Sequence, residues 1–104
     1  MTSYSLSMKT APARSDLDRA ADLFKVLGDP TRLQILQMIG DNQQQELCSA
    51  DICAALNISA PTVSHHIKKL LGEGLIIRNK RGKWAYFEVM PTKYRKVSQF
   101  IHSL

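Results

Sequence analysis

Long apolar runs and cysteines are both scarce in this sequence, and each scarcity excludes a class of protein. No apolar run is long enough for a signal peptide or a membrane span, so we expect a cytoplasmic protein with no membrane partner. The two cysteines, Cys48 and Cys53, lie too close together to cross-link a fold, and we expect them to be reduced. A chain of 104 residues without internal repeats builds one hydrophobic core. We therefore predict a flexible tail over residues 1–15 and one domain over residues 16–104.

Acidic residues are scarce in one part of the chain. Residues 58–96 hold nine lysines and arginines against two glutamates, whereas the remainder holds five basic residues against seven acidic ones. Positive charge confined to one segment creates a local potential that suits a polyanion such as double-stranded DNA. Charge alone is equally consistent with a solvated lysine face.

The spacing of apolar residues predicts about five helices. The first runs from Asp16 to Leu27, with apolar residues every three or four positions, and ends at Gly28. The third is short and ends at Asn57, a residue that tolerates the left-handed conformation. The other helix starts carry residues that cap or open a helix: Asp29 with Pro30, Ser49, Ser59 and Pro91.

The third and fourth helices are joined by a very tight turn, which is typical of a helix-turn-helix motif. After the break at residues 72–74, two apolar, β-branched or aromatic segments, residues 75–78 and 84–89, flank a cationic turn at residues 79–82. That pattern predicts a β-hairpin. The fold class is therefore mainly α with a β-hairpin wing (α+β), a winged helix-turn-helix.

The fourth helix separates into a buried and an outward face when it is drawn as a helical wheel. Val63, Ile67, Leu70 and Leu71 share the apolar face. Hydroxyl and imidazole groups on the other side can read base edges, whereas lysines contact phosphates. The candidate DNA-binding residues of this helix and of the hairpin are Ser59, Thr62, Ser64, His65, His66, Lys68, Lys69, Arg78, Lys80, Arg81 and Lys83.

Other roles for these residues are less consistent with the pattern. His65 and His66 diverge by about 100° on a helix, so they do not easily share a metal ion. Trp84, Tyr86 and Phe87 fit a hairpin core or an interface better than a base-stacking platform. An enzyme is not expected, because no buried carboxylate orients the histidines. A winged helix that binds another protein remains the alternative, and salt dependence distinguishes the two.

Four segments together resemble the ArsR/SmtB family of metalloregulatory repressors: GDPTRLQIL, ELCSADIC, NISAPTVSHHIKKL and GLIIRNKRGKWAYFEV. The resemblance spans about residues 18–102. It implies a homodimer that binds an inverted repeat in double-stranded DNA and is released by an effector. It also implies dimerisation through the first and last helices, groove contacts from Ser64 and His65, and wing contacts from Arg81 and Lys83.

The metal-binding patterns of that family are only partly present. Its arsenic-sensing pattern, ELCxCxxC, is kept as Cys48 and Cys53 with Ala50 in the middle. Of the family's zinc-sensing pattern in the last helix, only His102 remains. The cysteines that another variant of the family carries in an N-terminal arm are absent. The resemblance therefore implies no required cofactor and a trivalent arsenic or antimony effector. Because such ions prefer three thiolates, a third donor or an organoarsenical that needs two thiolates is required.

The start of the third helix offers a way to bring the two sulfurs together. Five residues apart on a regular helix, two side chains diverge by about 140°. If Ser49 is the N-cap, Cys48 and Cys53 instead take the N′ and N4 positions, which meet in a hydrophobic staple. A helix N-terminus also favours the thiolate. Binding of a soft ion, a redox switch and simple packing are the three interpretations of this pair.

Overall fold

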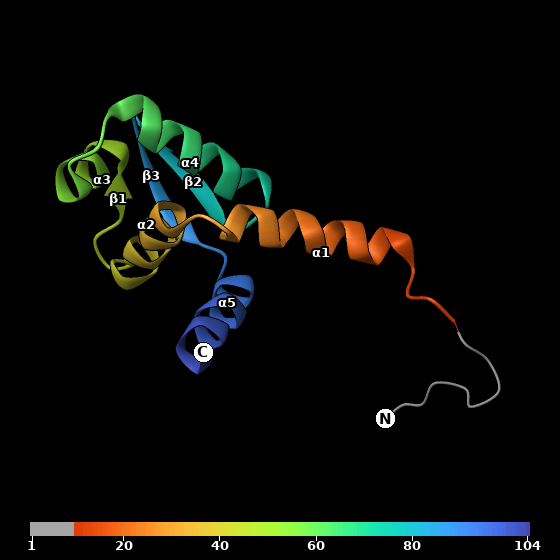
Figure 1. Cartoon of the computed structure of the whole chain (residues 1–104). Coiled ribbons are helices and arrows are strands. Elements are labelled where there is room, and N and C mark those ends of the chain that lie inside the picture. The colour runs from red at the N-terminus through yellow and green to blue at the C-terminus, as the bar shows by residue number, and fades with distance from the viewer. Residues whose placement is uncertain (1–9) are drawn as a thin grey trace.

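The computed structural model describes residues 10–104. The elements in chain order are α1 (Arg14–Leu27), α2 (Pro30–Asp41), β1 (Leu47–Cys48), α3 (Ser49–Leu56), α4 (Ala60–Gly72), β2 (Ile76–Arg81), β3 (Trp84–Val89) and α5 (Pro91–Ser103). The five predicted helices and the hairpin are confirmed (Figure 1). Most of the predicted tail, residues 1–9, lies outside the described residues, and α1 begins two residues earlier than predicted.

Local capping explains where several helices begin and end. The Asp29 carboxylate accepts a hydrogen bond from the Arg32 N–H at 3.0 Å, and Ser59 Oγ accepts one from the Thr62 N–H at 3.3 Å. Asn57 ends α3 with a φ of 55°. The prediction that Ser49 caps α3 is wrong, because Cys48 is the N-cap.

The three strands form an antiparallel sheet in the order β1-β3-β2. The predicted turn at residues 79–82 is displaced: β2 extends to Arg81, and residues 82–83 make the turn. Gly82 has a φ of +63°, which glycine adopts without the strain that a Cβ would cause. Strand β1 was not predicted, because two residues are too few to show an alternating pattern.

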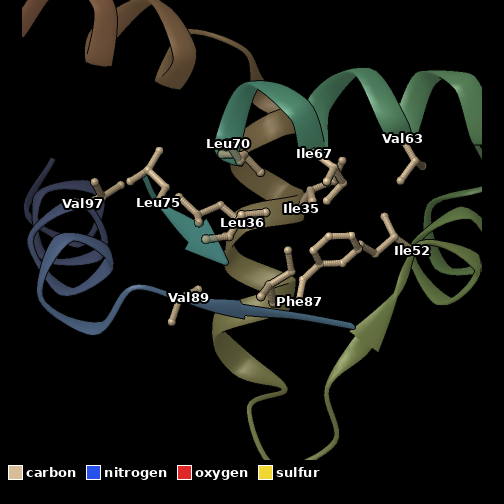
Figure 2. Close-up of a cluster of buried hydrophobic side chains, with 12 residues drawn as sticks. Ile35, Leu36, Ile52, Val63, Ile67, Leu70, Leu75, Phe87, Val89 and Val97 are labelled. Carbon is tan, nitrogen blue, oxygen red and sulfur yellow. The ribbon is translucent and has the colours of Figure 1, made fainter. Parts of the chain in front are cut away.

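The core lies between α2, α3 and α4 on one side and the sheet on the other, and Figure 2 shows these side chains converging. Phe87 and Val89 of β3 point into it, whereas Trp84 is 55% exposed. Of the two places expected for Trp84, a hairpin core or an interface, the hairpin core is excluded by this exposure. The buried apolar residues are Ile35, Leu36, Ile39, Ile52, Val63, Ile67, Leu70, Leu75, Ile76, Phe87, Val89 and Val97.

The first and last helices are only partly covered. α1 has no buried residue and extends away from the other elements (Figure 1). In α5, Val97 is buried, and the Tyr94 ring packs over Gly40 so closely that no Cβ fits there. No helix within residues 10–104 is long and apolar enough to cross a membrane.

Candidate nucleic-acid interface

Helix α4 presents a polar face to solvent and an apolar face to the core. Val63, Ile67 and Leu70 are at most 3% exposed, as the helical wheel predicts. Figure 1 shows α4 at the edge of the molecule, with α3 beside its N-terminal end. Most of the candidate residues on α4 and at its N-cap are exposed: Ser59, Thr62, Ser64, His65, Lys68 and Lys69.

The N-terminal half of α4 carries the groups that can read base edges. Ser59 Oγ and Thr62 Oγ1 lie 2.9 Å apart, so capping fixes both hydroxyls at the start of the helix. Within residues 10–104, the side chains of Ser64 and His65 have no hydrogen-bond partner. Their donors and acceptors are therefore free to meet a ligand.

His66 differs from the other candidates, and its inclusion as an outward-facing residue was wrong. Its side chain is buried, and Arg32 Nε of α2 donates to its Nδ1 at 3.3 Å. Arg32 Nη1 donates to the Val26 carbonyl at 2.9 Å, so the guanidinium joins α4 to the end of α1. Burial lowers the pKa of His66, and Asp29 opposes this shift only in part. His66 therefore holds α4 in place from inside.

All four hairpin cations are exposed, and three of them form no ion pair within residues 10–104. Arg78 and Lys80 are exposed on β2, and Lys83 is exposed in the turn beside Gly82. Together with Lys68 and Lys69 of α4, they give the chain two separate cationic elements. A positive patch on each element suits the two strands of a duplex backbone.

The fourth hairpin cation, Arg81, is held by other side chains. It forms an ion pair with Glu46, and its guanidinium lies 5.1 Å from the centre of the Tyr86 ring. Asn79 donates to carboxylate oxygens of Glu46 and Glu88, each at 2.9 Å. Glu46 therefore offsets part of the hairpin charge and holds the half of β2 that leads into the turn.

Arg32 and Glu46 are the residues that sequence reasoning missed. Arg32 continues the buried face of α2, three and four residues before Ile35 and Leu36. A charged residue on an otherwise apolar face indicates a buried polar partner, and this signal was present in the sequence. Glu46 gave no such signal, because it follows the polar residues 41–45 and lies on no apolar face.

The two cysteines have different surroundings. The Cys48 N–H donates to Asp51 Oδ2 at 2.9 Å, and Cys48 Sγ lies 3.3 Å from the same oxygen. Cys53 is half-buried and packs against the core. The predicted staple geometry is wrong, because Cys48 is the N-cap and Cys53 lies five residues into the helix. Within the described chain, no group of three or more His, Cys, Asp or Glu side chains could hold a metal ion.

Comparison with known proteins agrees with this fold. Residues 29–78, which span α2 to β2, match the family model "Bacterial regulatory protein, arsR family". An uncharacterized HTH-type transcriptional regulator of Methanocaldococcus jannaschii is 31% identical over 87 residues, covering 84% of this chain and 96% of that protein.

Two further relatives extend the comparison. The arsenical resistance operon repressor of Escherichia coli is 41% identical over 69 residues, covering 66% of this chain and 57% of that repressor. The homodimeric winged helix-turn-helix DNA-binding domain of a Mycobacterium bovis protein has the same fold, with a TM-score of 0.75 at 23% identity over 92% of this chain and 88% of that domain. The chain belongs to the ArsR family of bacterial regulatory proteins, which are DNA-binding transcriptional regulators and not enzymes.

Proposed function

We propose that this protein is a homodimeric transcriptional repressor that binds an inverted-repeat operator in double-stranded DNA. The observation that carries the proposal is the outward face of α4, where hydroxyl and imidazole groups precede two lysines. The N-terminal half, with Thr62, Ser64 and His65, enters the major groove and contacts base edges. Lys68 and Lys69 contact phosphates and contribute affinity without sequence preference.

The β2–β3 wing contacts the duplex beside the recognition helix. Arg78, Lys80 and Lys83 are exposed on the hairpin, and Arg81 is steadied by Glu46 and Tyr86. Exposed lysines and arginines at a hairpin contact phosphates or the adjacent groove. Helix and wing together then hold the duplex at two places.

Dimerisation places two recognition helices on one operator. Leu17 and Phe24 of α1, Phe100 of α5 and Leu104 just after α5 are exposed apolar residues, so these two helices are the proposed interface. The similar domain from Mycobacterium bovis is described as homodimeric. A two-fold dimer presents two α4 helices, and each contacts one half-site of the operator. The two half-sites then lie about one helical turn of DNA apart, roughly 34–36 Å.

Salt-dependent DNA binding tests this function. Fluorescence anisotropy with the DNA upstream of the protein's own gene should show tight binding. The logarithm of the association constant should fall linearly with the logarithm of the salt concentration. A random duplex of equal length is the control, and it should bind more weakly with a comparable slope. Binding to neither duplex would favour a winged helix that recognises another protein.

The effector proposed for the two cysteines is a thiophilic ligand such as trivalent arsenic or antimony. The relative from Escherichia coli is named as an arsenical resistance repressor, which supports this choice. The donor set fits incompletely, because Cys48 and Cys53 supply two thiols where the ion prefers three. A small thiol as third donor, or an organoarsenical that needs two thiolates, completes the set.

The position of the cysteines suggests how such a ligand releases DNA. Cys53 packs against the core, and its neighbour Ile52 is fully buried where α3 meets α4. A Cys53 thiolate turned toward Cys48 leaves that packing and shifts α3, which supports α4. A coupling of about 1–3 kcal/mol weakens operator binding by roughly 5- to 150-fold.

Replacing both thiols tests the effector site. Arsenite, antimonite and phenylarsine oxide should each be titrated into the preformed complex, with peroxide as a separate arm for the redox alternative. Release by an arsenical in the wild type and none in the Cys48→Ser, Cys53→Ser double variant is the expected result. Release that persists in the double variant, with operator affinity unchanged, would contradict a role for these cysteines.

A further inference from the structure

A polar pocket lies beside α4, on the side where α1 ends. Its volume is about 350 Å³, and its wall brings together residues from three helices and the α1–α2 turn. The lining residues are Lys25, Val26, Gly28, Asp29, Arg32 and Lys69. Three of them are cations, and each comes from a different helix: α1, α2 and α4.

Arg32 gives this pocket a preformed donor. Arg32 is only 8% exposed, and its Nε and Nη1 already donate hydrogen bonds to His66 Nδ1 and to the Val26 carbonyl. Within residues 10–104 the structure gives Nη2 no hydrogen-bond partner, and no carboxylate lies within 4.0 Å of the guanidinium. A largely buried guanidinium with a free amino group favours an anionic acceptor.

The acidic residue in the pocket does not fill this role. The Asp29 carboxylate accepts a hydrogen bond from the Arg32 backbone N–H, so it serves as the N-cap of α2. Three cations against one engaged carboxylate leave the pocket with a positive excess. An oxyanion with several acceptor oxygens, such as a phosphate group, complements that set.

The pocket is continuous with the proposed DNA-binding face. Lys25 and Lys69 also line a neighbouring hollow with Lys68, so cations extend from the outward face of α4 to the end of α1. Asp22 and Glu73 line the same hollow, so its three lysines stand against two carboxylates and the positive excess is larger in the pocket at Arg32. A duplex held by α4 carries phosphates at regular intervals along each strand. Its backbone is therefore the nearest source of an anion for the pocket.

We propose that one phosphate of the bound duplex docks in this pocket, against Lys25, Lys69 and the free amino group of Arg32. This inference rests on the proposed function and adds the end of α1 to the DNA-binding surface. Arg32 then contacts the DNA backbone and His66 of α4 with the same guanidinium. A phosphate contact of this kind contributes affinity and fixes the orientation of α4, but carries no sequence preference.

The test compares two lysine-to-glutamine variants of the full chain. Lys25→Gln removes one exposed charge at the pocket, and Lys96→Gln removes the same charge from α5. Anisotropy should be measured on operator and random duplexes at several salt concentrations. We expect Lys25→Gln to weaken both complexes equally and to reduce the salt slope by about 1, with Lys96→Gln close to wild type.

Two outcomes would overturn the inference while leaving DNA binding intact. The first is a salt slope for Lys25→Gln that equals the slope for Lys96→Gln. In the second, inorganic phosphate raises the melting temperature of the wild type more than chloride does at the same ionic strength. Lys25→Gln then abolishes this stabilisation, but the salt dependence of its DNA affinity stays as in the wild type. That result would assign the pocket to a free anion. Failure of the wild type to bind either duplex would instead refute the proposed function itself.

Discussion

At the scale of single residues, the adjacent histidines of α4 have opposite roles because their neighbours differ. His65 is exposed, whereas His66 is 7% exposed and accepts a hydrogen bond from a guanidinium. An Nδ1 that accepts from Arg32 carries no proton, so the imidazole is neutral in the native state. Protonating it would place two cations together in a largely buried site.

This arrangement predicts that stability falls as the solution is acidified below the ordinary histidine pKa of 6.5. Burial lowers the pKa of His66 in the folded chain, so between the two values the unfolded chain binds the extra proton and is favoured. The loss should begin near pH 6.5 and level off below the folded pKa. Urea or thermal unfolding between pH 7.5 and 5 measures it.

The matched variants for that measurement are His66→Gln and His65→Gln. The first should flatten the pH dependence, and the second should keep it, because only His66 is buried against Arg32. The lowered pKa of Asp29 acts only near and below its ordinary value of 3.8, outside this window. An unchanged slope in His66→Gln would show that another group is responsible.

At the scale of the elements, the features that could be predicted from sequence are those that depend on residues close together in the chain. The caps at Asp29 and Ser59 and the apolar face of α4 depend on residues within a few positions, and all three are confirmed. The burial of His66 depends on Arg32, 34 residues away, and β1 exists only through its pairing with β3. Local patterns carry no information about such partners.

The division of labour along α4 can be tested with one residue from each half. His65→Ala should reduce discrimination between operator and random duplex, by about 1–3 kcal/mol if it removes a base contact. Lys69→Ala should weaken both complexes comparably, because a phosphate contact carries no sequence information. Competition binding at fixed salt measures both. Equal losses on the two duplexes for both variants would contradict the assigned roles.

At the scale of the whole molecule, α1 extends outward with Leu17 and Phe24 uncovered, whereas the apolar residues near its C-terminal end pack against the core. Phe24 is 61% exposed and Phe100 of α5 is 59% exposed. Removing such apolar side chains from water is favourable in free energy, so a surface that leaves them uncovered indicates an interface. Tyr94 and Ile101 of α5 pack against the core of their own chain, so the uncovered part of α5 is narrower than its apolar stripe. A second copy is the proposed cover.

Charge placed on this surface should therefore separate the protomers. Phe24→Glu and Phe100→Glu are expected to shift the protein from dimer to monomer, because burying an unpaired carboxylate at an interface is costly. Trp84→Glu, which changes a comparably exposed aromatic residue on the hairpin, should leave the dimer intact. Sedimentation velocity over a range of concentrations distinguishes the two cases. Dimers in all three variants would place the interface elsewhere.

Cys48 links the sheet that carries the β2–β3 wing to α3, the helix that packs against α4. It is the last residue of β1, where it pairs with Tyr86, and it is also the N-cap of α3. Tyr86 in turn lies beneath Arg81 of the wing. We therefore expect an adduct on this sulfur to disturb both the pairing of β1 with β3 and the start of α3. Under the proposed function, we expect the wing and α4 to release the operator in one step.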